Sequence, residues 1–198
     1  MALPTLHPMK LPGPWSQGFV LERQHTLSST LIGHDSNGNP QFDTKRSELG
    51  ELVFRLKNRN DRTALVPIEE AAVEFIKRWS PAANVVVPVP PSRRRTFQPV
   101  VEIAKAIGRS LRLPVELTAV AKSKQTPELK NVFDFDERTT ALLGAFKVNE
   151  KAVQGKRILL VDDLYRSGAT ASIVAKALLS GGAASVHMLA MTKTRTRT

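Results

Sequence analysis

The chain has 198 residues, of which 41% are hydrophobic and 24% charged, which is ordinary for a globular protein and long enough for a substantial core. No apolar run approaches the roughly 18 residues of a membrane helix, and the absence of cysteine excludes disulfides and thiolate metal sites without indicating the redox compartment. The first residues lack the layout of a signal peptide, so we expect a cytoplasmic protein. The net charge of +11 suits phosphorylated ligands or nucleic acid, although it can equally be a solvated basic surface.

The first 80 residues predict a small N-terminal region. Residues 1–15 are rich in proline and favour irregular structure, and His34–Pro40 is rich in turn formers. We expect two short β segments at Phe19–Glu22 and Ser29–Gly33, and two helices at Ser47–Asn58 and Pro67–Trp79.

Residues 81–198 predict an α/β core. We expect strands at Asn84–Pro90, Val115–Val120, Ile158–Val161 and Val186–Met191, and helices at Pro99–Leu111 and Ala171–Ser180. The polar stretch 122–140 suits a long mobile loop. Strands that alternate with helices over short connections predict a mostly parallel sheet flanked by helices.

The segment ILLVDDLYRSGAT, residues 158–170, carries the most chemistry. Because ligands of an open α/β sheet gather beyond the carboxyl ends of its strands, Asp162 and Asp163 are placed to accept hydrogen bonds from the two vicinal hydroxyls of a ribose. The following helix start presents backbone N–H groups to a phosphate, Gly168 permits close backbone approach, and Ser167 and Thr170 add hydroxyl donors. The segment therefore predicts a ribose 5-phosphate site.

Three other interpretations of this segment compete. A buried strand before a capped helix uses Asp or Ser for structural reasons alone, but two acids followed by R-S-G-A-T exceed that need. ILLVDD also opens response-regulator receiver domains, which need about a hundred further residues, whereas 35 follow Asp163 here. A Walker A loop requires G-x-x-x-x-G-K, which this segment lacks. We therefore favour phosphoribosyl binding.

The same segment closely resembles the fingerprint of type I phosphoribosyltransferases, which bind 5-phosphoribosyl-1-pyrophosphate (PRPP). The resemblance implies the fold of that class, in which residues 1–80 would form a hood-like region or appendage beside a core of residues 81–198. It also implies that Asp162 and Asp163 contact the ribose hydroxyls. The 5-phosphate would bind to Arg166, Ser167, Gly168, Ala169 and Thr170, although Arg166 stands where a small residue is usual.

A second segment, VVVPVPPSRRRTFQ at residues 85–98, matches the position of the pyrophosphate-binding loop in that class. The resemblance implies pyrophosphate contacts from Pro91, Ser92, Arg93 and Arg94, and the arginines 93–95 offer charge-assisted hydrogen bonds. Alternatively, the three arginines only solvate a loop.

The order of these segments resembles the ComF/GntX group of competence-associated, phosphoribosyltransferase-like proteins over about residues 45–191. L-K-N-R-N-D (56–61) matches the lysine-bearing segment of that group, and Lys122–Arg138 its mobile loop. Lys122, Lys124 and Arg138 are then candidate contacts, or equally surface charges. Many members carry a four-cysteine zinc ribbon, which this sequence lacks, and its scattered histidines argue against a zinc site. His187 is expected to be a packed or edge residue of a strand.

The resemblance implies transfer of the phosphoribosyl group from PRPP to an unidentified nucleophile, such as a nucleobase, with release of pyrophosphate. Asp162, Asp163 and Arg93 are the candidate catalytic residues, and Mg²⁺ is expected on substrate oxygens rather than on protein side chains. No residue stands out as a base for the nucleophile. The alternative is a catalytically silent PRPP sensor or a protein associated with single-stranded DNA in competence. A homodimer is expected by analogy alone.

Overall fold

The computed structural model describes residues 3–91, 96–123 and 144–194. Their main sheet has five strands in the order β1-β2-β9-β8-β5. These strands are β1 (Met9–Lys10), β2 (Gln17–Glu22), β9 (Ser185–Lys193), β8 (Arg157–Tyr165) and β5 (Val85–Pro88). The pairs β2–β9, β9–β8 and β8–β5 are parallel, and β1 is an antiparallel edge. The predicted α/β fold with a mostly parallel sheet is confirmed.

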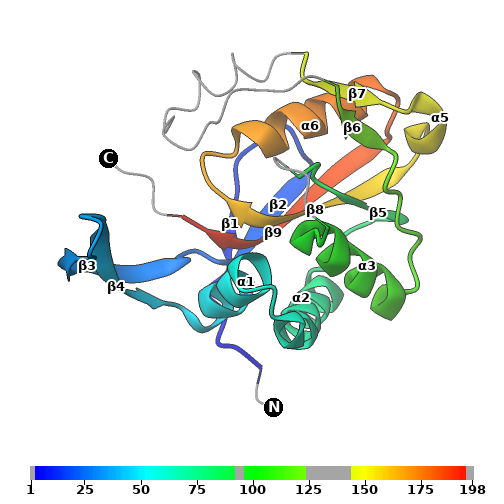
Figure 1. Ribbon diagram of the computed structural model, residues 1–198. Coiled ribbons are helices and arrows are strands. Elements are labelled where there is room, and N and C mark those ends of the chain that lie inside the picture. Colours follow the sequence, from blue (N-terminus) through cyan, green and yellow to red (C-terminus); the bar gives the residue numbers. More distant parts are fainter. Residues whose placement is uncertain (1–2, 92–95, 124–143, 195–198) are drawn as a thin grey trace.

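Helices cover both faces of this sheet (Figure 1). One face carries α1 (Glu48–Asn58), the 3-10 turn η1 (Arg62–Ala64), α2 (Leu65–Trp79) and α3 (Pro99–Leu111). The other carries α6 (Ala169–Ser180), the small β6–β7 pair (Val120–Lys122 with Phe146–Val148) and the short α5 (Glu150–Val153). Within the described ranges, no helix is long and apolar enough to cross a membrane.

Alternation along β8 divides the core into two apolar clusters. Ile158 and Leu160 pack with α6, whereas Leu159 and Val161 pack with α1, α2 and α3. Successive side chains of a strand point to opposite faces, so this parity also determines which way the acids at the end of β8 point.

Helix α1 forms where the sequence pattern predicts it. The Gly50 N–H donates to Ser47 Oγ at 3.1 Å, which caps the first turn, and acids and bases flank the helix in the order that its dipole favours. Its buried face holds Leu49, Val53 and Leu56. This face fixes α1 on the sheet and determines where its remaining side chains lie.

Residues 1–80 contribute strands to the main sheet as well as helices. Strand β2 pairs in parallel with β9 from Gln17↔His187 to Glu22↔Thr192. The sheet thus combines strands from both sides of the proposed division between residues 80 and 81, and that division stays a prediction. His187 is buried in the interior strand β9, with its ring edge-on to Trp79, so it is a packed residue and not an edge one.

Several segments differ from the sequence expectations, among them β1, which lies within residues 1–15 that were expected to be irregular. Val115–Val120 is not one strand, because Val115 makes a single bridge to Val86 and β6 begins at Val120. Strand β8 continues four residues beyond Val161, through both acids to Tyr165. Residues 26–46 form a hairpin, β3 (Thr26–His34) with β4 (Pro40–Arg46), of which only the centre of β3 was expected. Strand β4 escaped prediction because its sequence PQFDTKR has no buried, apolar alternation.

Candidate functional site

The carboxyl ends of the parallel strands meet at one edge of the sheet, and the chemistry-bearing residues follow them. Val89 N–H donates to Val161 O at 2.8 Å, so the chain that continues through Pro90 and Pro91 leaves β5 beside the acids of β8. At the same edge, Thr192 lies near the end of β9, and His25 N–H donates to Lys193 O at 2.8 Å. This edge brings together residues in or after β5, β8 and β9 with His25, which lies in the connection between β2 and β3.

Asp163 points to the α1 side of the sheet and forms a partly buried ion pair with Lys57. Lys57 Nζ lies 3.0 Å from Asp163 Oδ1 and 2.8 Å from Oδ2, and Asp163 is only 7% exposed. A buried carboxylate depends on such a partner, because removing the partner leaves an uncompensated charge. The pair ties the last turn of α1 to the end of β8.

By the alternation of β8, Asp162 points to the other face, toward α6. Its Oδ1 accepts the Asp163 N–H at 2.9 Å. Burial, assisted by the charge of Asp163, raises the pKa of Asp162 to about 7, although the charge of Lys57 acts in the opposite direction. The site therefore holds one carboxylate fixed by a lysine and another close to its protonation point at neutral pH, rather than two equivalent acids side by side.

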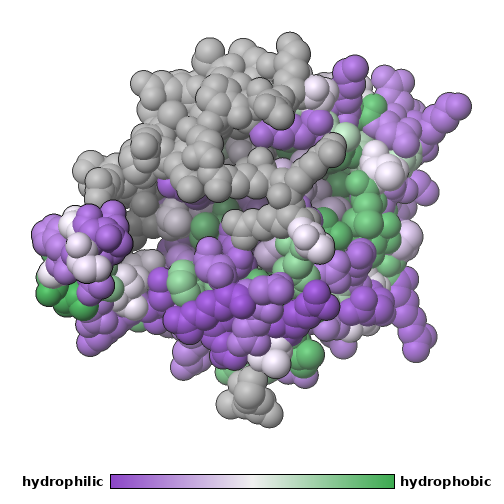
Figure 2. Space-filling view, viewed as in Figure 1, coloured by the Kyte–Doolittle hydropathy of each residue, from purple (hydrophilic) through white to green (hydrophobic). Residues whose placement is uncertain are grey.

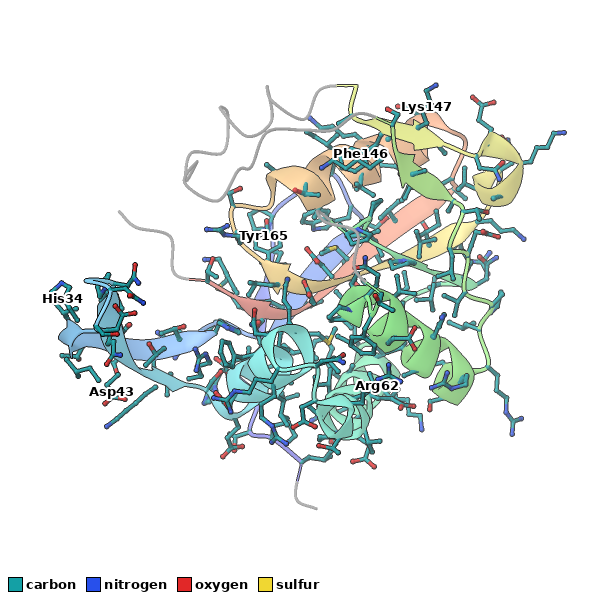
Figure 3. The ribbon with its side chains drawn as sticks, viewed as in Figure 1. His34, Asp43, Arg62, Phe146, Lys147 and Tyr165 are labelled. Atoms are coloured by element: carbon teal, nitrogen blue, oxygen red, sulfur yellow. The ribbon has the colours of Figure 1, made fainter. Side chains whose placement is uncertain are left out.

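The turn after β8 is shaped by Tyr165 and Gly168. Tyr165 is buried on the α6 side of the sheet (Figure 3), where burial and the charge of Asp162 raise its pKa. Gly168 has φ +86°, and a Cβ added there would collide with the Tyr165 hydroxyl. Only glycine satisfies both conditions, so the backbone turns closely over the tyrosine.

Helix α6 begins directly after this turn. Its N-cap is Gly168, which has no side chain to cap the first turn, and no acid follows in that turn. Ser167 Oγ accepts the Ala169 N–H at 3.4 Å, while Arg166, Ser167 and Thr170 are partly exposed. Backbone N–H groups and the positive end of the helix dipole are thus presented at the sheet edge that carries Asp162.

A short chain of hydrogen bonds links His25 to the main chain at Asp163. His25 Nδ1 lies 3.0 Å from Thr192 Oγ1, which donates to Asp163 O at 3.4 Å. Because the threonine hydroxyl donates to the carbonyl, its oxygen accepts from His25 Nδ1–H. Burial lowers the pKa of His25 to about 4, assisted by the charges of Arg46 and Lys57. His25 is therefore neutral at pH 7. No sequence motif indicated that this histidine lies at the edge of the sheet that carries the acids.

The predicted site residues divide into two groups. Pro91 lies in the segment that follows β5, and Lys122 lies in β6, where burial lowers its pKa. Ser92, Arg93, Arg94, Lys124 and Arg138 lie outside the described residues. Lys57 is not among the predicted site residues, although it lies in the segment L-K-N-R-N-D that carries part of the family resemblance. Only the contact with Asp163 reveals its place.

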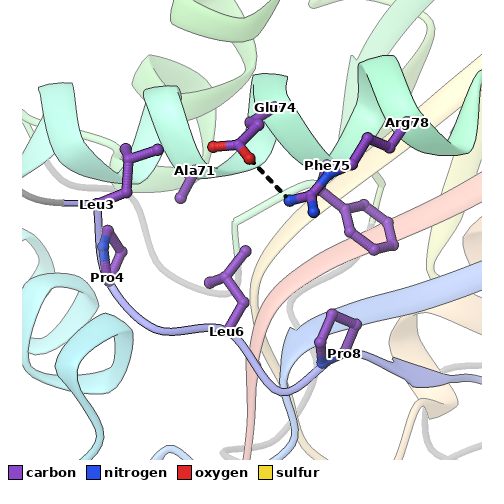
Figure 4. Close-up of a pocket in the computed structure, with 8 residues that line it drawn as sticks. All are labelled: Leu3, Pro4, Leu6, Pro8, Ala71, Glu74, Phe75 and Arg78. Atoms are coloured by element: carbon purple, nitrogen blue, oxygen red, sulfur yellow. Dashed lines mark ion pairs between the residues drawn. The ribbon is translucent and has the colours of Figure 1, made fainter.

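A cavity of about 500 Å³ lies away from this sheet edge, between the N-terminal segment and α2 (Figure 4). The Glu74–Arg78 ion pair, 3.0 Å long, spans part of its wall. Its other lining residues are mainly apolar: Leu3, Pro4, Leu6, Pro8, Ala71 and Phe75. None of the predicted site residues lines it, so the cavity is separate from the sheet edge described above.

Comparisons with protein-family models and with curated proteins find no match to this chain. Solved structures do match. Glutamine PRPP amidotransferase from B. subtilis, complexed with ADP and GMP, gives a TM-score of 0.50 at 17% identity over 79% of this chain and 34% of that chain. Adenine phosphoribosyltransferase from Thermoanaerobacter pseudethanolicus gives 0.45 at 14% identity over 84% and 94%. The chain thus spans about a third of the amidotransferase, and the fold is that of type I phosphoribosyltransferases.

Proposed function

We propose that the chain binds PRPP at the carboxyl edge of its sheet and transfers the phosphoribosyl group to a small nucleophile. In this reaction a bond from the nucleophile to the anomeric carbon forms, the bond from that carbon to pyrophosphate breaks, and pyrophosphate leaves. One observation carries the proposal: the acidic end of β8 runs through the Tyr165–Gly168 turn directly into the start of α6, where the N-cap Gly168 has no side chain to occupy the backbone N–H groups. Hydrogen-bond acceptors for a diol therefore adjoin donors for a phosphate.

The 5-phosphate is assigned to the start of α6. Arg166, Ser167 and Thr170 are partly exposed, whereas Gly168 and Ala169 are buried and shape the backbone. An anion gains from several backbone N–H groups and from the helix dipole at such a terminus. The hydroxyls of Ser167 and Thr170 supply further donors.

The ribose is assigned to the acids, with divided roles. Asp162 lies on the side of the phosphate turn, so it is the first choice for a hydroxyl contact. Asp163 is held by Lys57, so its carboxylate is already oriented before substrate arrives. Orienting groups in advance reduces the entropy lost on binding. Lys57 thereby joins the proposed site as a positioning residue.

Pyrophosphate is assigned to Pro91, Ser92, Arg93 and Arg94, because the chain leaves β5 beside Val161. Arginines there would stabilise the charge that develops on the leaving group. Mg²⁺ suits this site as an ion carried by substrate oxygens: Asp163 is bound to Lys57, and Asp162 accepts backbone N–H groups, which leaves few carboxylate oxygens for a metal. Bound in that way, the ion would neutralise phosphate charge.

We further propose that the chain is a ComF-like phosphoribosyltransferase. This assignment rests on the order of the segments 56–61, 85–98 and 122–146 along the chain, and the acceptor within that group is left to experiment. The single-stranded-DNA alternative rests on the net charge of +11 and on the same resemblance. No contact among the described residues favours it over transfer.

Calorimetric titration with PRPP and Mg²⁺ tests the binding half of the proposal. We expect the wild type to bind, and Asp162→Asn to weaken binding at least tenfold because a neutral amide replaces an acceptor for the ribose hydroxyls. Glu74→Gln, which alters a carboxylate on α2 away from the sheet edge, is the matched control. Absence of binding by the wild type would refute the proposal.

Turnover needs its own assay, because binding alone also fits a sensor. Pyrophosphate release is measured with PRPP, Mg²⁺ and each of a panel of nucleobases. Release that depends on one acceptor supports transfer. Binding without release for any acceptor would instead favour the catalytically silent alternative.

A further inference from the structure

The hairpin of β3 and β4, residues 26–46 and here called the arm, projects from the body of the protein (Figure 1). Most of its residues are exposed. It carries four of the large hydrophobic residues that the described part of the chain exposes, and Figure 2 shows hydrophobic surface on the lower edge of this projection. The four are Leu27 (44% exposed), Leu31 (51%), Ile32 (65%) and Phe42 (53%).

The pairing register gives the arm two unlike faces. Leu31 pairs with Phe42, and two residues along, Ser29 pairs with Thr44, whose hydroxyl lies 3.0 Å from that of Ser29. Because side chains alternate along a strand, these four share one face. The pairs between them, Thr30↔Asp43 and Ser28↔Lys45, occupy the other. Leu27 and Ile32 lie at the two irregularities of the ladder. One face is therefore apolar with small hydroxyls, and the other is polar.

The base of the arm is fixed to the body. The Arg46 guanidinium lies 3.6 Å from the centroid of the Phe54 ring and 3.2 Å from Glu51 Oε2, both in α1. A two-stranded hairpin with a solvated apolar face is marginally stable in water. The arm is thus held out on a firm base with a face that gains from being covered.

Charge points to a second copy of the chain as the cover. Residues 26–46 hold two acids, Asp35 and Asp43, and two bases, Lys45 and Arg46, so the arm has no net charge, and the rest of the chain carries the whole +11. Two copies that meet elsewhere bring like charges together, whereas arms can meet without that repulsion. An acidic partner would instead bind to the part of the chain outside the arm, because that part carries the positive charge.

We propose that two copies of the chain associate through their arms, apolar face against apolar face about a twofold axis. Such an interface is isologous, so Leu31 of one copy contacts Phe42 of the other and the reverse. The face is small for a stable interface. The dimer is therefore expected to dissociate on dilution.

Sedimentation equilibrium over a range of concentrations tests the association. We expect the wild type to shift from monomer to dimer, and Leu31→Ser with Phe42→Ser to raise the dissociation constant at least tenfold. Val66→Ser is the matched control, since Val66 is 55% exposed on α2 and should leave the constant unchanged. A wild type that stays monomeric, or a double variant that still forms the dimer, would overturn the proposal.

The absence of cysteine in the chain permits a second, independent test. Thr44→Cys and Asp43→Cys introduce single thiols at adjacent positions on opposite faces of the arm. With a short bismaleimide we expect Thr44→Cys to cross-link two copies several times faster than Asp43→Cys. Equal rates would show that the apolar face is not the contact.

Discussion

Lys57 Nζ lies 2.8 Å from Asp163 Oδ2, although the two residues are 106 positions apart in the chain. The contact joins the last turn of α1 to the end of β8. It means that the proposed ribose site is completed by a helix from the N-terminal part of the chain. A substitution of Lys57 should therefore affect both the stability of the fold and the binding of ribose at the proposed site.

Replacing Lys57 by methionine keeps the aliphatic length and removes the charge. We expect the free energy of unfolding to fall by about 2 kcal/mol at pH 7, less than for a fully enclosed pair because Lys57 is partly exposed. Urea denaturation measures this fall. Arg78→Met, which breaks the exposed pair with Glu74, should change the value by about 0.5 kcal/mol or less. Equal effects of the two substitutions would contradict a structural role for the Lys57 pair.

Asp162 gives stability a pH dependence of unusual sign for a carboxyl group. Its pKa in the folded protein is about 7 against an ordinary 3.8, so the folded state holds its proton where the unfolded state has lost it. The stability that this group contributes is present below pH 4 and is lost as the pH rises toward 7. Asp162→Asn should therefore be more stable than wild type at pH 8, by about 1–3 kcal/mol.

Urea denaturation at pH 5 and pH 8 checks the Asp162 prediction, because the advantage of the variant should shrink at the lower pH. Asp35→Asn serves as the control of opposite sign. Hydrogen bonds from Asn39 lower the pKa of Asp35, which is exposed in the hairpin turn, so its loss should not stabilise the protein at pH 8. An Asp162→Asn variant that is less stable than wild type at pH 8 would contradict the assignment.

Gly168 should tolerate no side chain. Gly168→Ala meets both the left-handed φ of +86° and the hydroxyl of Tyr165, so we expect unfolding free energy to fall by about 2–4 kcal/mol and phosphate binding at the start of α6 to weaken. Gly38→Ala is a close control: its φ is +78°, but no atom lies within 4 Å of the added Cβ. That variant should lose about 1 kcal/mol. Similar losses at both glycines would show that Tyr165 does not restrict the turn.

His25 should make the protein sensitive to acid. Its pKa in the folded state is about 4 against an ordinary 6.5, so between these values the unfolded state takes up a proton that the folded state does not. Stability is then lost as the pH falls from about 6.5 to 4. Melting temperatures at pH 7.5 and pH 5 should fall less in His25→Gln than in wild type. His34→Gln, at the exposed end of β3, should behave as wild type; a wild-type response of His25→Gln would exclude the histidine as the cause.

The sequence by itself determined the elements whose signals are local. The apolar spacing and cap of α1, the amphipathic pattern of α3 and the strand, acids, glycine and helix of residues 158–170 each lie within a short window, and the structure places elements there. Steric and hydrogen-bonding preferences over such windows do not depend on the rest of the chain. The fold class followed from the same alternation of strands and helices.

Tertiary structure alone decided which distant residues meet. The sequence PQFDTKR contains no pattern that predicts β4 as half of an exposed hairpin. The residues near Gln17–Glu22 likewise do not predict that this strand pairs in parallel with β9. The pairing of Lys57 with Asp163, and of His25 with Thr192, arises because separate strands end at one edge and α1 packs beside it. Contacts of this kind depend on the order of strands in the sheet, and that order is fixed by the packing of the whole chain and not by any segment of it.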